Sequence, residues 1–246
     1  MTPTLTAFAA SPDCGRGLAR DFRVRWALEE LGLTCDVRLV SFEELGTPDY
    51  RKLQPFGQIP AWREDDLDLF ESGAIMLHLA QGHPGLLPPD PAGRARATAW
   101  VFAALDTVEP PIWDWDLARM VEGDKAWHAA REPILRARIR KRLGELAAWL
   151  ADDDWLEGSF TAGDLMMVTV LRRLHGSGML EDHPSLAAYV ARGEARPAFQ
   201  RAFAAQKAEA ARAIGPHALG TDYHGVEQAT DAAGIVSSTA KEPSGP

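Results

Sequence analysis

Cysteine is scarce in this chain. Its 246 residues include two cysteines, Cys14 and Cys35, so a framework of several disulfides is excluded. Neither cysteine lies in a CxxC or Cys/His spacing typical of zinc sites, and no histidine cluster or carboxylate pair predicts a metal or hydrolytic centre. We therefore expect no bound metal.

Long apolar runs and an excess of positive charge are also missing. No run approaches the roughly 18 apolar residues that cross a bilayer, and the start of the chain, MTPTLTAFAASPD, lacks the basic and apolar regions of a signal peptide. The net charge is −9 and no basic stripe is present, so neither nucleic acid nor a membrane is expected as a partner. These features predict a cytoplasmic protein whose partners are small molecules or other proteins.

The first 81 residues predict an α/β domain. A strand is expected at Leu5–Ala9, an amphipathic helix at Leu18–Leu31 that ends at Gly32, and a second strand at residues 34–40. The segments IPAWRE and LDLF predict a hairpin that turns at two aspartates, and a helix is expected at residues 72–81. The order βαβ-ββα is typical of a thioredoxin-like domain.

The strand expected at residues 34–40 has a period of two. Cys35, Val37 and Leu39 alternate with Asp36 and Arg38. This pattern predicts a half-buried strand whose apolar side chains face the core.

The rest of the chain predicts a second, helical domain. Residues 82–93 contain four prolines and three glycines, which predicts a linker. Residues 94–214 have helical periodicity throughout, and Thr161 with Asp164 has the spacing of a capping box at the start of a buried helix. Residues 215–246 have no periodicity, so we expect a mobile tail.

Four segments, in order along the chain, resemble the glutathione S-transferase family. The most specific is LQPFGQIPAW followed by DLFESGAIMLHLA, within residues 53–80, which is similar to the family's N-P-x-G-x-[VI]-P and E-S-x-A-I segments. WALEELGL at 26–33 and FTAGDLMM at 160–167 resemble its first-helix and capping-box segments. The resemblance implies a thioredoxin-like α/β domain followed by an all-α helical bundle for substrate binding and dimerisation. It also implies glutathione as co-substrate and a homodimer.

The resemblance places a glutathione site on the first domain. Pro60 would be a cis-proline that exposes the N–H and C=O of Ile59, with which a peptide-like ligand can pair as an added strand. Ser72 is expected to be a helix N-cap whose hydroxyl, with the first-turn N–H groups, can bind a carboxylate, while Glu71 can pair with an α-ammonium group. By resemblance Gln58 would contact the glycyl end of glutathione. The alternatives are that Pro60 shapes a strand and that Ser72 caps a helix.

The segment SPDC, residues 11–14, is the candidate catalytic loop. Ser11 can donate a hydrogen bond that stabilises the glutathione thiolate, whereas Cys14 can act on glutathione itself and give a thiol-dependent reductase. The loop is longer than in much of the family, and an alignment anchored on RVRW puts Ala19 or a neighbour at the catalytic position. Ser11 and Asp13 are also common turn residues.

A substrate pocket is expected between the domains. Glu109–Pro111 predicts a kink that ends the first long helix, and Trp113, Trp115 and Met120 after it can line an apolar pocket or pack in the core. The sequence thus predicts a glutathione transferase that acts on small hydrophobic electrophiles. The alternatives are a reductase that uses Cys14 and a non-catalytic module on the same fold, such as a regulatory or elongation-factor domain.

Overall fold

The sheet has four strands and mixed direction. The structure is a computed structural model that describes residues 2–214; the tail predicted at 215–246 lies outside the described residues. The strand order is β2-β1-β3-β4, with β1 parallel to β2 and the other neighbours antiparallel. The strands are β1 (Thr4–Phe8), β2 (Asp36–Val40), β3 (Ala61–Glu64) and β4 (Leu67–Phe70).

The helices of this unit complete the predicted βαβ-ββα order. They are α1 (Asp21–Leu31), α2 (Phe42–Leu45), α3 (Pro48–Leu53) and α4 (Ser72–Gly82). Side chains of α1 and α4 pack with those of β1 and β3 in one apolar cluster. Gly32 ends α1 with a φ of 67°, as its position predicts. The thioredoxin-like α/β prediction is confirmed.

The predicted start of the first helix was wrong by three residues. The helix begins at Asp21 and not at Leu18. The reason is that the backbone N–H groups of Leu18 and Ala19 donate to the Asp13 carboxylate, at 2.5 and 3.0 Å. These residues therefore belong to the loop after β1.

The predicted burial of the second strand was also wrong. Val37 and Leu39 are 37% and 42% exposed, and Val40 is the one fully buried residue of β2. The alternation is present in the sequence, but β2 lies at the edge of the sheet. Edge position left the apolar face of this strand incompletely covered.

The second half of the described chain is helical, as predicted. Its elements are α5 (Pro91–Phe102), the π-helical turn η1 (Ala103–Val108), α6 (Glu109–Val121), α7 (His128–Leu150), α8 (Ala162–Leu171), the 3₁₀ turn η2 (Arg172–Leu174), α9 (Pro184–Glu194) and α10 (Pro197–Ile214). Thr161 and Asp164 form the predicted capping box of α8, every residue of which is buried. The expected kink corresponds to η1, after which α6 begins with both prolines in its first turn. No helix of the described part is long and apolar enough to cross a membrane.

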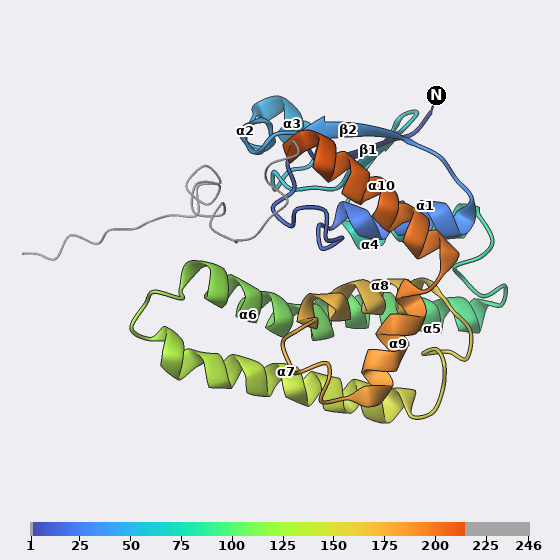
Figure 1. The fold of residues 1–246 in the computed structure, drawn as a ribbon. Helices are drawn as coiled ribbons and strands as arrows, with labels where there is room; N and C mark the ends of the chain where they lie inside the picture. Colours follow the sequence, from blue (N-terminus) through green and yellow to red (C-terminus); the bar gives the residue numbers. More distant parts are fainter. Residues whose placement is uncertain (1, 215–246) are drawn as a thin grey trace, which may run out of the picture.

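The two predicted domains share a large hydrophobic cluster. Phe22 and Trp26 of α1 belong to the same buried cluster as the side chains of α5 to α9. In Figure 1, α10 returns from the helical part and runs along α1. Arg25 of α1 pairs with Asp21 of the same helix at 2.7 Å and with Glu209 of α10 at 2.8 Å. The sequence assigns α10 to the second domain, but its contacts also attach it to the first.

Candidate functional site

The loop that precedes β3 presents an unpaired backbone edge. The Ile59–Pro60 peptide is cis, as the resemblance implies. Buried Gln54 accepts the N–H of Gln58 on Oε1, and the Tyr50 hydroxyl donates to the Gln58 carbonyl at 2.8 Å. No residue of the described chain forms a hydrogen bond with the N–H or C=O of Ile59. Both groups are therefore available to a ligand.

The start of α4 contains a buried hydroxyl beside a buried cation. Ser72 is the first helical residue and not the N-cap, which corrects the sequence prediction; Glu71 takes the cap position with a φ of 69° and makes no capping bond with its side chain. Ser72 is 3% exposed, and its Oγ accepts a hydrogen bond from Arg23 Nη1 at 3.2 Å. No side chain caps the first-turn N–H groups of α4, and Glu71, directly before the helix, is exposed.

Arg23 belongs to an ion cluster between the two halves of the protein. Its Nη2 donates to Glu109 Oε1 of α6 at 2.7 Å, and Arg20 approaches the same oxygen at 3.5 Å. Burial would raise the pKa of Glu109, but the charges of Arg23 and Arg20 outweigh burial and hold that pKa below its usual value. Glu109 therefore stays ionised and keeps the two guanidiniums at the N-terminus of α1.

The SPDC loop is organised by Asp13. The Asp13 carboxylate accepts the Ser11 hydroxyl at 2.6 Å and the N–H of Gly15 at 3.0 Å, in addition to the two loop N–H groups described above. Ser11 lies next to α10, in a small hollow that Gln206 and Glu209 also line. The only hydroxyl proton of Ser11 is thus donated to Asp13, on the α10 side of the loop.

Cys14 and Ala19 have different surroundings. Cys14 is exposed and has a φ of 52°. Ala19 packs against the apolar cluster that contains Ile59. The following residue, Arg20, is the N-cap of α1 and makes no side-chain capping bond. The residue just before the N-cap of α1 thus shares an apolar cluster with Ile59, whereas Ser11 lies in the hollow beside α10.

Two arginines from the end of α8 hold this loop in place. Arg172 donates to the carbonyls of Arg16 and Gly17, at 3.0 and 2.7 Å, and Arg173 donates to the Leu18 carbonyl at 3.1 Å. The Arg172 guanidinium is buried and lies 4.8 to 5.4 Å from three phenylalanine rings. Consecutive carbonyls of the loop are thus fixed by the helical half of the protein.

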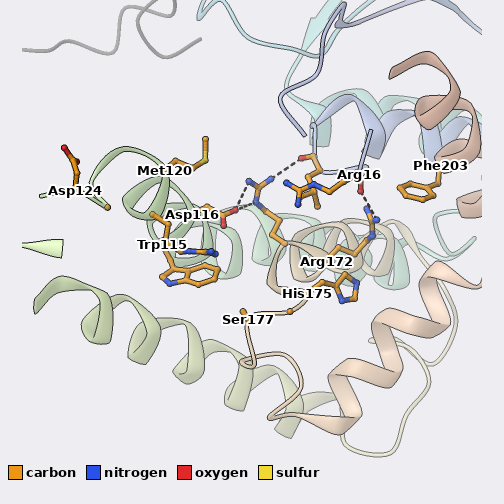
Figure 2. A pocket seen from close by; sticks show the side chains of 14 residues that line it. Arg16, Trp115, Asp116, Met120, Asp124, Arg172, His175, Ser177 and Phe203 are labelled. Carbon is orange, nitrogen blue, oxygen red and sulfur yellow. Dashed lines mark hydrogen bonds and ion pairs between the residues drawn. The ribbon is translucent and has the colours of Figure 1, made fainter. Parts of the chain in front are cut away.

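A cavity of about 830 Å³ lies between this loop, α6 and the segment after α8. Figure 2 shows Trp115, Asp116 and Met120 on one side, with Arg172 and His175 opposite. Trp115, which also belongs to the buried core, and Met120 line the cavity. Trp113 does not: its ring lies between the guanidiniums of Arg20 and Arg173, at 5.1 and 4.9 Å.

Sequence reasoning missed most of the groups that position this site. The position of Arg23 in the first helix only weakly indicates a role in the site, and no local residue identifies its partner Glu109, which is 86 residues away. The roles of Arg172 and Arg173 likewise depend on contacts with a loop about 155 residues earlier. Within the described residues, no group of three or more metal-binding side chains is present.

Comparison with known proteins identifies the family. Residues 15–81 match the model of the glutathione S-transferase N-terminal domain. The glutathione S-transferase PARB of Nicotiana tabacum is 30% identical over 162 residues, which cover 61% of this chain and 75% of that protein. A tetrachloro-p-hydroquinone reductive dehalogenase of Sphingobium chlorophenolicum is 26% identical over 223 residues, which cover 73% of this chain and 90% of that protein.

A solved structure agrees over most of the chain. A glutathione transferase from Burkholderia graminis, solved with two glutathione molecules bound per subunit, is 26% identical and superimposes with a TM-score of 0.71. The match covers 82% of this chain and 87% of that one. The fold, the order of the motifs and these relatives agree, and the chain belongs to the glutathione S-transferase family.

Proposed function

We propose that this protein binds glutathione between the Ile59 loop and the start of α4 and transfers it to a small electrophile. The observation that carries the proposal is the unpaired Ile59 backbone on the same unit as the Ser72 hydroxyl, which is held by Arg23. The cysteinyl backbone of glutathione pairs with Ile59 as an added strand. The relative solved with glutathione supports this use of the fold.

The two ends of glutathione have separate partners in this proposal. The Ser72 hydroxyl, the first-turn N–H groups of α4 and the Arg23 charge bind the γ-glutamyl carboxylate. The Glu71 carboxylate pairs with the adjacent α-ammonium group. Gln58, which is exposed, contacts the glycyl end. Each charged group of the γ-glutamyl moiety thus meets an opposite charge or a hydrogen-bond donor.

The thiolate is placed at the N-terminus of α1. A helix N-terminus lowers the pKa of a nearby thiol, whose ordinary value is about 8.5. The sulfur then attacks the electrophilic carbon: a C–S bond forms, the leaving group departs with its bonding electrons, and the thiol proton goes to solvent. Ser11 and Cys14 are the side-chain alternatives for thiol activation, and Ser11 would have to release Asp13 to take that role.

A glutathione-dependent reductase is the second candidate. Cys14 is exposed on the catalytic loop, and a reductive dehalogenase is among the relatives. In this reaction the Cys14 thiolate attacks the glutathionyl sulfur of a substrate that is itself a mixed disulfide with glutathione, the substrate's S–S bond breaks and its other sulfur leaves as a thiolate. A second glutathione thiolate then attacks the disulfide between Cys14 and glutathione, which yields oxidised glutathione and free Cys14. The homodimer implied by the resemblance stays a prediction, which light scattering checks.

Substitutions at the start of α4 test the glutathione site. We expect Ser72→Ala and Glu71→Ala each to raise the dissociation constant for glutathione about tenfold, because each removes a charge-assisted contact. The free energy of unfolding should change by no more than about 1 kcal/mol for Glu71→Ala, whose side chain is exposed and makes no capping bond. Isothermal titration calorimetry and urea denaturation measure the two quantities.

A matched control and the opposing outcomes complete this test. Glu43→Ala, which removes an exposed carboxylate from the short helix α2, should leave the glutathione affinity unchanged. Equal affinities in the wild type and both α4 variants would mean that these residues are structural. No binding by the wild type at millimolar glutathione would favour a non-catalytic module.

A further inference from the structure

The cavity beside the catalytic loop combines apolar walls with positive charge. Its apolar surface comes from the loop, α6 and α10, through Leu18, Trp115, Met120 and Phe203. Four arginines and one histidine line the same space, against two aspartates. The sequence predicts small hydrophobic electrophiles as substrates, and one without charge would need the apolar walls but not these cations.

Several of these charges already have partners. Arg172 pairs with Glu194 at 2.6 Å, and Arg173 pairs with Asp116 at 2.8 Å. Asp124, the second acidic residue of the lining, pairs with Lys125 at 2.9 Å. The local charges therefore cancel within these pairs.

Arg119 is different. Among the described residues no carboxylate lies within ion-pair distance of its guanidinium, which is 4.6 Å from the centre of the Trp115 ring. The Trp115 side chain is 3% exposed, and its indole N–H has no hydrogen-bond partner in the described part of the chain. Arg119, which is exposed, thus gives one wall of the cavity a cation that no carboxylate of the described residues neutralises, and such a cation favours a negatively charged ligand.

The cavity also adjoins the place proposed for the reacting sulfur. Leu18 lines the cavity, while the next residue, Ala19, packs against the cluster that contains Ile59. The two sites therefore share the short stretch of loop before α1. This stretch of loop thus connects the cavity to the N-terminus of that helix, where the thiolate is proposed to lie.

We propose that the cavity binds aromatic electrophiles that carry a carboxylate, and that Arg119 binds this carboxylate. The inference rests on the proposed transferase function and specifies its second substrate. The aromatic body lies against Trp115, Met120 and Phe203, and the carboxylate keeps its charge throughout the reaction. With a chloroaromatic acid, the thiolate forms a C–S bond at the carbon that bears chlorine, and chloride leaves with the bonding electrons.

A matched pair of electrophiles tests the proposal. 4-Chloro-3,5-dinitrobenzoate and 1-chloro-2,6-dinitrobenzene differ only in the carboxylate, and the uncatalysed reaction of each with glutathione corrects for intrinsic reactivity. We expect the corrected kcat/KM of the wild type to be about tenfold higher for the benzoate. In Arg119→Gln the ratio of the two corrected kcat/KM values should fall to about one, mainly through a higher KM for the benzoate.

Arg142→Gln is the control for the change in net charge. Arg142 is an exposed arginine of α7 that pairs with Glu145 and does not line the cavity, so its replacement should leave the preference intact. Equal corrected rates for both electrophiles in the wild type, or a preference that Arg119→Gln retains, would overturn the proposal while leaving the transferase function in place.

Binding of an unreactive acid separates this inference from the transferase function. By calorimetry, 3,5-dinitrobenzoate should bind the wild type and bind Arg119→Gln about tenfold more weakly. If neither electrophile is conjugated but this difference in affinity is found, the transferase function fails and the anion site stands. If the acid binds both proteins equally, or neither, the anion site is refuted whatever the catalytic result.

Discussion

Replacing Arg23 with methionine is expected to lower the free energy of unfolding by about 3 to 5 kcal/mol, because it leaves the Glu109 carboxylate buried without its main partner. The side chains of Arg23 and Glu109 are 4% and 6% exposed, and Arg20 is the more distant cation at 3.5 Å. Glutathione affinity should fall as well, since Ser72 loses its neighbouring charge. Urea denaturation and calorimetry measure the two effects.

Two further variants show whether the loss comes from the unpaired charge. The double variant Arg23→Met/Glu109→Leu removes both charges and should recover most of the stability, but not the glutathione affinity. Arg138→Met breaks an exposed pair with Asp114 and should cost less than about 1 kcal/mol. A loss of under about 1 kcal/mol in Arg23→Met would contradict the role assigned to this cluster.

The stability contributed by the cluster also depends on pH. Arg23 and Arg20 depress the pKa of Glu109 below its ordinary 4.5, against the effect of burial. A depressed carboxyl pKa stabilises the folded state above the unfolded pKa, and this stabilisation is lost as the pH falls through the folded pKa. In Arg23→Met burial instead raises the pKa of Glu109, so the difference in stability between wild type and variant should shrink steadily as the pH is lowered toward and below 4.5, as urea denaturation at several pH values checks.

Replacing Cys14 with serine is expected to separate the two candidate reactions. Conjugation should stay within about twofold of the wild-type rate, because the proposed thiolate site uses backbone N–H groups of α1. Glutathione-dependent reduction through Cys14 would be abolished, since that reaction needs the sulfur as nucleophile. Steady-state rates with a chloroaromatic substrate and with a mixed disulfide provide the measurement, and loss of conjugation in Cys14→Ser would make Cys14 part of the transferase reaction.

Ser11→Ala is the companion variant. We expect the thiol of bound glutathione to titrate at the same pH as in the wild type, because the Ser11 proton is donated to Asp13. Absorbance of the thiolate across pH gives this value directly. An increase of one to two pKa units in the variant would instead identify Ser11 as the thiolate's hydrogen-bond donor.

The elements that local sequence determines were predicted well. The capping box at Thr161, the end of α1 at Gly32 and the hairpin at the two aspartates each depend on a few adjacent residues. Features set by distant contacts were not predicted. Val37 and Leu39 alternate with polar residues, but their exposure follows from the edge position of β2.

The same difference between local and distant contacts decides which parts of the candidate site were predicted. Ile59 and Ser72 were located from short motifs, although the N-cap assignment of Ser72 was wrong because its hydroxyl contacts Arg23, 49 residues earlier. The conformation of the SPDC loop was not predictable. The Asp13 carboxylate accepts hydrogen bonds from backbone N–H groups of the loop, and Arg172, from the other half of the chain, donates to carbonyls of the loop. The chemistry of a loop held from both sides cannot be deduced from its own residues.

A crystal structure of the protein with glutathione tests the central claim most directly. The account predicts that the cysteinyl backbone pairs with Ile59, the γ-glutamyl carboxylate meets Ser72 and the first turn of α4, and the sulfur lies at the N-terminus of α1, nearer the N–H of Arg20 than the hydroxyl of Ser11. Glutathione bound elsewhere, or with its sulfur on Ser11 Oγ or Cys14 Sγ, would contradict it.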